Sequence, residues 1–422
     1  MDQRRKVGRS QMAAYYLTAG ISGLALGLTM SYLMVYLHDG RGISLVVAGL
    51  ALSGGGLSGF IFSAMAGTFI DRIGPLRSLQ TGMVLQGLSA VAVALVRTVP
   101  EAFLAVAFAG MGPALFWPSQ ASMVAALVSG ENRSRSFATQ FMIVNAGVGI
   151  GEMVSGSVIH LYSVQSYVYV YVAEALILFI APLLLGFSFR NVRVQIHNPT
   201  DEADVSGPVD MPLGYRSVFA NRSFRSFMYV HVGFVFFGYS QLEAAWAAYA
   251  TQYAGATPRV VGLAFAANTG VIVLAQLYVG RLIDRFRRSR ALVLAALGWV
   301  VTWLMAFFAS FAALRGFWSD AILVCSLGVF GLAETVYAPV DTTLVNDLAP
   351  SNLRGRYNAV SSSGFAFASL FAAPLAGILL GSGISYAWVI PMVVGSGGVA
   401  LKAARLSGVL PPEAEAPRTH PI

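Results

Sequence analysis

The sequence has little charge and almost no cysteine. Of its 422 residues, 11% are charged and 56% are hydrophobic, whereas roughly 25% of the residues of a typical soluble domain are charged. Such a chain cannot cover itself with a surface that water wets, and it is too apolar for intrinsic disorder. Cys325 is its single cysteine, which excludes an internal disulfide and a multi-cysteine metal site. These absences leave a membrane protein with many spans.

Lysine is scarce as well, since only Lys6 and Lys402 occur. Neither residue follows a glycine-rich loop, so the chain lacks the G-x-x-x-x-G-K-[ST] motif that binds nucleotide phosphates. The sequence also shows no nucleophile–base constellation and no metal-ligand spacing. We therefore expect neither ATP-driven pumping by this chain alone nor an enzyme.

Long apolar runs make up most of the chain. A membrane helix needs about 20 mostly apolar residues, and about twelve runs reach that length. The first run follows a basic N-terminus and is too long for the apolar core of a signal peptide, so we interpret it as an uncleaved span. The predicted spans are 12–37, 44–70, 78–97, 101–128, 136–161, 165–189, 224–253, 259–283, 291–312, 320–347, 357–381 and 385–408.

The basic residues predict the orientation of these spans. With the N-terminus in the cytoplasm, 23 of the 27 lysines and arginines fall on the cytoplasmic side, as the positive-inside rule requires. Both termini are then cytoplasmic. The net charge of +8 is explained by this topology, and we expect no nucleic-acid partner.

A polar stretch divides the chain into two halves. Residues 190–222 have no hydrophobic period and are predicted to be a cytoplasmic linker between a six-helix bundle at 1–189 and a second one at 223–410. The proline-rich tail at 411–422 is predicted to be disordered.

The two halves repeat each other. The segment 67–72, GTFIDR, matches 280–285, GRLIDR, at an offset of 213, and Pro118 matches Pro339 at an offset of 221. Each half has six spans, an even number, so the copies have the same orientation. Parallel repeats of this kind surround a site at the middle of the membrane.

The loop after the second span resembles a motif of the major facilitator superfamily, G-x-x-x-D-R-x-G-x-[RK]-[RK]. The residues that match it are Gly67, Asp71, Arg72, Gly74 and Arg77, and the second copy retains Asp284 and Arg285. The resemblance implies an all-α membrane protein with twelve helices in two bundles. It also implies that these seven residues take part in gating, because a carboxylate near a helix N-terminus stabilises that helix.

The fifth span resembles the drug:proton antiporter branch of that family. Its glycines follow the G-x-G-x-G-P-x-x-G-G pattern from Gly147 to Gly156, with Glu152 where proline is usual. The resemblance implies export of small molecules in exchange for protons.

Four carboxyl groups at membrane depth are candidates for function, because an ionisable group there costs about 2.5–3.5 kcal/mol and usually faces a wet interior, whereas Glu174 on the sixth span is expected to be structural. The resemblance places the first, fourth, seventh and tenth spans around a central cavity. It therefore places Glu243, Glu334 and Asp341 there. A carboxyl group removed from bulk water can bind and release a proton near neutral pH. The proton-coupling candidates are Glu334, Asp341, Glu243 and Glu152.

Uncharged polar and aromatic groups complete the predicted substrate site. They lie in the predicted spans and are Trp117, Gln120, Tyr337, Asn145, Gln241 and Asn268. An apolar cavity with few acids suits amphipathic or cationic compounds. His160 and His231 lie near span ends and are expected at the membrane interface.

The sequence thus predicts a proton-coupled exporter of amphipathic or cationic small molecules in the bacterial inner membrane. We expect it to work as a monomer with no cofactor other than the coupling proton. The alternatives are an importer of a small solute, proton-coupled or facilitative, and a lipid-handling or non-transporting protein on the same scaffold. An importer of anions should carry arginine or lysine at membrane depth, and none is evident there, since the basic residues of the predicted spans, such as Arg97, lie near the span ends.

Overall fold

The computed structural model describes residues 9–128, 132–190, 215–283, 285–314, 316–350 and 353–416, and within them it contains helices and no strand. The first half comprises α1 (Arg9–Thr29), α2 (Leu33–Val35), the π-helix η1 (Tyr36–Gly40), α3 (Leu45–Ile73), α4 (Pro75–Ala94), α5 (Val99–Ala109), α6 (Met111–Leu127), α7 (Asn132–Val158) and α8 (Val164–Phe189). The second half begins with α9 (Tyr215–Ala220), α10 (Arg222–Phe234), the π-helices η3 (Val235–Tyr239) and η4 (Leu242–Trp246), α11 (Ala247–Gln252) and α12 (Pro258–Ile283). It continues with α13 (Arg288–Ala309), η5 (Ala312–Leu314), α14 (Phe317–Asp347), α15 (Arg354–Gly381), α16 (Ser385–Ala404), η7 (Arg405–Gly408) and α17 (Pro412–Glu415).

Ten helices of the described chain are long and apolar enough to cross a membrane. The two expected spans outside this set are 78–97, which falls on α4, and 224–253, which π turns divide into α10, η3, η4 and α11. The apolar helical character of the chain is confirmed. A total of twelve spans and the cytoplasmic position of the termini stay predictions.

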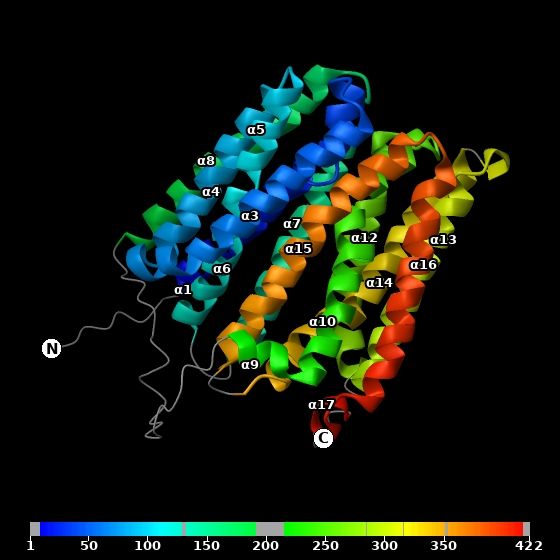
Figure 1. Ribbon diagram of the computed structural model, residues 1–422. Helices are drawn as coiled ribbons and strands as arrows, with labels where there is room; N and C mark the ends of the chain where they lie inside the picture. Colours follow the sequence, from blue (N-terminus) through cyan, green and yellow to red (C-terminus); the bar gives the residue numbers. More distant parts are fainter. Residues whose placement is uncertain are drawn as a thin grey trace.

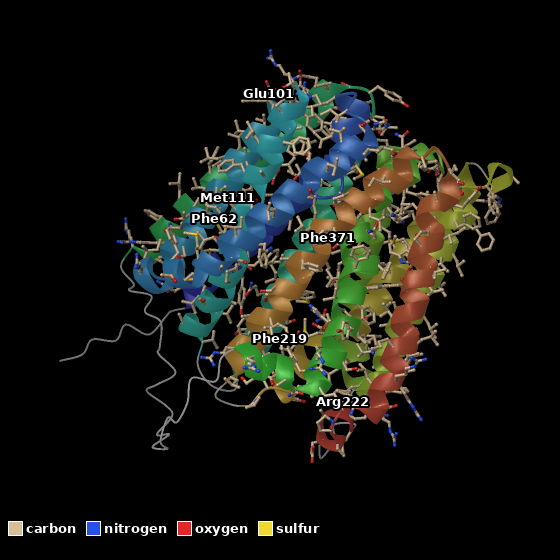
Figure 2. The ribbon with its side chains drawn as sticks, in the orientation of Figure 1. Phe62, Glu101, Met111, Phe219, Arg222 and Phe371 are labelled. Atoms are coloured by element: carbon tan, nitrogen blue, oxygen red, sulfur yellow. The ribbon has the colours of Figure 1, made fainter. Side chains whose placement is uncertain are left out.

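The two halves form separate helical bundles that meet at one end (Figure 1). Across the halves, α3 packs against α15 and α7 packs against α12. Glu101 marks the end where the bundles meet, and Phe219 and Arg222 mark the opposite end (Figure 2). We call these the closed end and the terminal end, because α1 begins and α16 ends at the latter.

Glycines allow the close approach at the closed end. A Cβ atom built on Gly49 would lie 3.0 Å from the Gly377 Cα atom, and one on Gly156 would lie 3.0 Å from the Gly262 Cα atom. Small residues let helix backbones come this close in a membrane, where no hydrophobic force drives helices together. These two glycine–glycine crossings hold the halves together.

The crossings follow the repeat predicted from the sequence. Gly262 follows Gly49 by 213 residues and Gly377 follows Gly156 by 221, the same offsets that relate the motif copies. The aromatic pairs follow the same repeat. The rings of Tyr36 and Tyr167 are 5.2 Å apart, and those of Tyr249 and Trp388, at the same offsets, are 4.9 Å apart. The repeat therefore extends to individual contacts.

The predicted disorder of the tail from residue 411 is wrong for residues 411–416. Pro412–Glu415 form α17, and the Glu415 carboxylate accepts a hydrogen bond from the Ser289 backbone N–H at 3.2 Å. This N–H belongs to the first turn of α13, where amides have no partner within the helix and favour a negative charge. Within the predicted linker, α9 is helical, and residues 191–214 lie outside the described residues.

The predicted gating loop forms the turn between α3 and α4. Gly74 joins these helices with a φ of 83°, a left-handed conformation that favours glycine. Arg72 and Arg77 are exposed there, and the space around the Gly67 Cα atom is open. In the second copy Arg285 is exposed. The side chain of Asp71 and the whole of Asp284 lie outside the described residues, so the gating roles stay predictions.

Alanine at position 262 should loosen the closed end. Its methyl group would meet the backbone carbonyl oxygen of Glu152, and overpacking of this kind costs about 1–3 kcal/mol. Across the two halves, Gln252 Nε2 donates to Asp39 Oδ1 at 2.7 Å. Cysteines placed at positions 39 and 252, in a Cys325→Ser background, should therefore cross-link the two halves. We expect Gly262→Ala to lower the cross-linking yield severalfold.

Gly270→Ala is the matched control, because it makes the same substitution in α12 where a Cβ atom meets open space. It should leave the cross-linking yield unchanged. Equal yields from the two variants would show that the α7–α12 crossing does not hold the closed end together.

Candidate functional site

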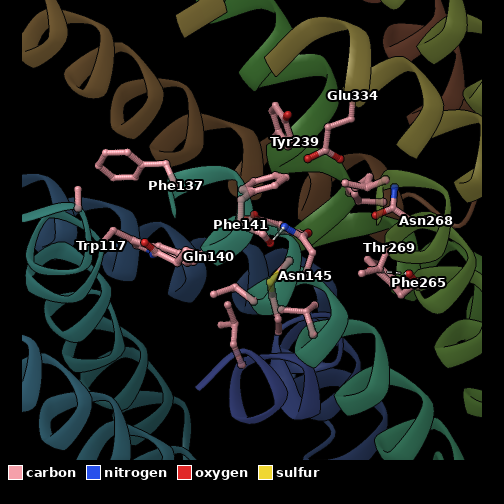
Figure 3. Close-up of a pocket in the computed structure, with 18 residues that line it drawn as sticks. Trp117, Phe137, Gln140, Phe141, Asn145, Tyr239, Phe265, Asn268, Thr269 and Glu334 are labelled. Atoms are coloured by element: carbon pink, nitrogen blue, oxygen red, sulfur yellow. Dashed lines mark hydrogen bonds between the residues drawn. The ribbon is translucent and has the colours of Figure 1, made fainter. Parts of the chain in front are cut away.

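A cavity of about 480 Å³ lies between the two halves (Figure 3). Helices α1, α6 and α7 of the first half and η3, η4, α12 and α14 of the second half contribute to its wall. The lining residues are Leu26, Met30, Trp117, Ala121, Phe137, Gln140, Phe141, Val144, Asn145, Val148, Tyr239, Leu242, Glu243, Phe265, Asn268, Thr269, Ile272 and Glu334. Its size is within the range of pockets that bind small organic molecules.

The first half supplies an apolar and aromatic wall. Trp117 on α6 and Phe137 and Phe141 on α7 are each more than one third exposed, and they lie on the same side of the cavity (Figure 3). The α7 residues that face the cavity recur three or four positions apart, from Phe137 to Val148. The sequence interpretation missed this face, although its helical spacing was visible.

The second half supplies the charge. Glu243 on η4 and Glu334 on α14 both line the cavity, and Tyr239 lies beside Glu334 (Figure 3). Glu334 and Asn268 lie opposite Trp117 (Figure 3). Among the described lining residues there is no arginine, lysine or histidine. The charged side chains of this wall are therefore carboxyl groups, which attract cations.

Half of the predicted central residues line the cavity. Trp117, Asn145, Asn268, Glu243 and Glu334 do so. Asn145 Nδ2 donates to the Phe141 carbonyl oxygen at 2.9 Å, and Asn268 Nδ2 donates to the Leu327 carbonyl oxygen at 3.3 Å. Each amide thus keeps its oxygen for another partner. Whether these side chains bind a substrate stays a prediction.

Asp341 and Tyr337 are not among the residues that line this cavity, and their roles in coupling and in substrate binding stay predictions. The Tyr337 hydroxyl donates to Asp341 Oδ1 at 3.0 Å, and His231 Nδ1 lies 2.8 Å from the same oxygen. The His231 side chain is buried between α14 and α15, and its expected depth at the membrane interface stays a prediction. The three groups contact one another outside the described lining of the cavity.

Gln120 and Gln241 also lie outside the cavity lining. Gln120 is buried and its side-chain oxygen accepts a hydrogen bond from Nε2 of Gln140, which does line the cavity. Gln241 is fully buried, where its Oε1 accepts from Trp388 Nε1 at 2.7 Å and its Nε2 donates to the Ala372 carbonyl oxygen at 3.2 Å. Its hydrogen bonds are used to join helices, so its predicted place in the substrate site is wrong.

Glu152 lies at the α7–α12 crossing and not in the cavity wall. Its carboxyl group is buried, and Oε1 accepts a hydrogen bond from the Ser31 hydroxyl at 2.6 Å. Its other oxygen, Oε2, has no protein partner. At the repeat-related position the other crossing has Ala373. The predicted close packing around Glu152 is therefore present, and its role in coupling stays a prediction.

Comparisons with known proteins agree with this architecture. The family model of the Major Facilitator Superfamily matches residues 15–247 and 232–421. Among solved structures, a peptide transporter POT has a TM-score of 0.78 at 13% sequence identity, with 97% of this chain and 96% of that chain covered. At this identity the likeness shows the fold alone.

Several bacterial relatives have related sequences. The chain is 25% identical over 334 residues to the MFS-type transporter YttB of Bacillus subtilis (strain 168), covering 78% of each protein. It is 23% identical over 386 residues to Multidrug resistance protein 2 of the same organism, covering 89% of this chain and 90% of the relative. A Na(+), Li(+), K(+)/H(+) antiporter of Planococcus maritimus is 24% identical over 330 residues, covering 72% and 75%.

The family match covers both halves of the chain and, with the helical fold and the cavity between the halves, identifies the molecule as a multi-pass membrane protein. The chain belongs to the major facilitator superfamily of transporters.

Proposed function

We propose that the protein exports amphipathic or cationic small molecules from a bacterial cell across its inner membrane in exchange for protons. The observation that carries the proposal is the pair of carboxyl groups, Glu243 and Glu334, in a cavity whose other described lining residues are uncharged. Multidrug resistance protein 2 and the cation/H(+) antiporter among its relatives support the same class of function.

The two carboxyl groups can bind either a proton or a cation. Both line the same cavity, where Glu243 is exposed, Glu334 is half-buried, and the other described lining residues are uncharged. Two like charges in an apolar setting repel each other, so the pair favours a state in which a proton or a bound cation neutralises one of them. Exchange of a proton for a substrate at this pair couples the two movements.

The apolar wall suits the organic part of such a substrate. Trp117, Phe137 and Phe141 present aromatic surface opposite the carboxyl groups. An aromatic face attracts a cation as well as apolar groups. A compound with a delocalised positive charge on an apolar body satisfies both walls at once.

Alternating access follows from the way the halves meet. The glycine crossings join α3 to α15 and α7 to α12 at the closed end, and the bundles diverge toward the terminal end (Figure 1). If the termini are cytoplasmic, this is the inward-facing conformation. Rocking of the two bundles about the cavity would separate the crossings and expose the site to the other side.

Neutralising the cavity carboxyl groups should uncouple transport. In proteoliposomes with an imposed pH gradient, using tetraphenylphosphonium as the probe, we expect Glu334→Gln and Glu243→Gln each to lower gradient-driven accumulation about tenfold or more, because glutamine carries no exchangeable acidic proton. Glu174→Gln is the matched control, since Glu174 is buried on α8 and does not line the cavity. Wild-type accumulation in both neutralised variants would refute the proposal.

Removing the exposed indole should weaken binding of an organic cation. We expect Trp117→Ala to raise the Kd for tetraphenylphosphonium roughly fivefold, the equivalent of about 1 kcal/mol of lost cation–π contact. Isothermal titration calorimetry on the purified protein measures this. Trp318→Ala, which removes an exposed indole of α14 outside the cavity, should have no effect, and the same Kd in both variants would contradict the placement of the substrate.

A further inference from the structure

We propose that His231, Asp341 and Tyr337 form a second proton-binding site in the second half, in which His231 and Tyr337 are buried and Asp341 is partly exposed. The site deepens the proposed proton antiport and rests on it for its part in transport. It joins α10, which carries His231, to α14, which carries the other two residues. None of the three residues lines the cavity.

Each ring nitrogen of His231 faces an acceptor oxygen and lies near a hydroxyl group, with Tyr337 OH 3.2 Å from Nδ1 and Ser361 Oγ 3.4 Å from Nε2. Nδ1 is 2.8 Å from Asp341 Oδ1, and Nε2 is 3.1 Å from the backbone carbonyl oxygen of Ser361. A neutral imidazole has one N–H and can donate to one of these acceptors, whereas an imidazolium donates to both. The geometry therefore fits a doubly protonated His231 held by an ionised Asp341. The Tyr337 hydroxyl donates to the same Asp341 oxygen at 3.0 Å and stabilises its charge.

Other ionisable groups around the cluster point elsewhere. On α15, Tyr357 accepts a hydrogen bond from Asn221 at the start of α10. On α16, the Lys402 ammonium lies 5.5 Å from the centre of the Tyr229 ring, and Arg405 after it is exposed. On η3, Tyr239 packs against Tyr337. Asp341 is therefore the acid that faces His231.

Tyr239 connects the cluster to the cavity. It lines the cavity beside Glu334, and its ring centre is 5.9 Å from that of Tyr337. A proton on Glu334 and a proton on the His231–Asp341 pair are thus separated by two tyrosines whose hydroxyl groups can both donate and accept. The imidazolium form of His231 is the loaded state of the site, so the cluster can release one proton toward the cavity acids and leave a neutral imidazole beside the Asp341 carboxylate.

The first half has no ionisable group at the corresponding positions. At the repeat offsets, Asp341 corresponds to Gln120 and Ser361 corresponds to Gln140, and these two amides pair with each other. His231 corresponds to Thr18, and the cavity acids Glu334 and Glu243 correspond to Pro113 and Met30. At the positions of His231 and Asp341 the first half thus carries Thr18 and Gln120, which are neutral, and Gln120 bonds to Gln140 instead.

The protonation state of His231 tests the site without any substrate. In protein labelled with ¹⁵N-histidine, His231→Gln identifies the His231 signals among those of the five histidines. We expect the wild type at pH 7 to show two protonated ring nitrogens, and Asp341→Asn to convert His231 to a neutral tautomer. A neutral His231 in the wild type would overturn the inference.

Transport then tests whether the site takes part in coupling. We expect His231→Gln and Asp341→Asn to lower accumulation of tetraphenylphosphonium driven by a pH gradient about tenfold, as removal of a proton-transfer group does, while binding of the same cation to purified protein is retained. Ser240→Ala is the matched control, because it removes the buried Ser240–Ser369 hydrogen bond between the same helical segment and α15. It should leave both readouts unchanged.

The two proposals fail in different ways. If Glu334→Gln abolishes gradient-driven accumulation and His231→Gln does not, the cluster is structural and this inference is wrong. If neither variant differs from the wild type, the proposed antiport itself is wrong, and this inference fails with it. Tyr337→Phe keeps the ring packing and removes one hydroxyl, so an intermediate loss of accumulation there supports a relay through Tyr337.

Discussion

The cost of placing a carboxyl group in the membrane interior governs this structure. Such a group must face water, bind a proton or find a partner. The membrane-depth acids divide accordingly: Glu243 and Glu334 face the cavity, Asp341 pairs with His231, and Glu152 bonds to Ser31 at a helix crossing. Each placement leaves a group that can exchange a proton, and this is why we attribute coupling to these residues and not to the abundant basic residues near the helix ends.

The second determinant is the internal repeat, in which the two halves share the arrangement of their helices but differ in the side chains at equivalent positions. Equivalent glycines form both crossings between the halves, and equivalent aromatic pairs pack within each half. The two cavity walls nevertheless differ, with aromatic side chains from the first half and carboxyl groups from the second. In the proposed exchange, a substrate with an apolar body and a positive charge would contact both walls, and its release would depend on the protonation of the second half. The shared backbone would allow the two halves to rock, and the carboxyl groups of one half would couple that movement to protons.

The sequence was sufficient for the fold and for part of the site. The helices and the family could be predicted from the apolar runs, the placement of the arginines and the repeated motifs, because each of these patterns depends on residues that are close together in the sequence. The positions of Glu243 and Glu334 followed from the resemblance.

The contacts of Asp341 could not be read from the sequence, because its partner His231 is 110 residues away and reaches it only through tertiary packing. Gln241 was misjudged for the same reason, since Trp388 occupies its side-chain oxygen. The short helix α17 was missed because its stability comes from Glu415 on the first turn of α13.

The central claim is that a proton and a cationic substrate compete for the same carboxyl groups. The most direct test is to add tetraphenylphosphonium to the purified protein in weakly buffered solution near neutral pH and to measure the protons released. The account predicts that proton release accompanies binding, saturates with it, and disappears in the Glu243→Gln, Glu334→Gln double variant. Saturable binding of the cation by the wild-type protein without any release of protons would contradict it.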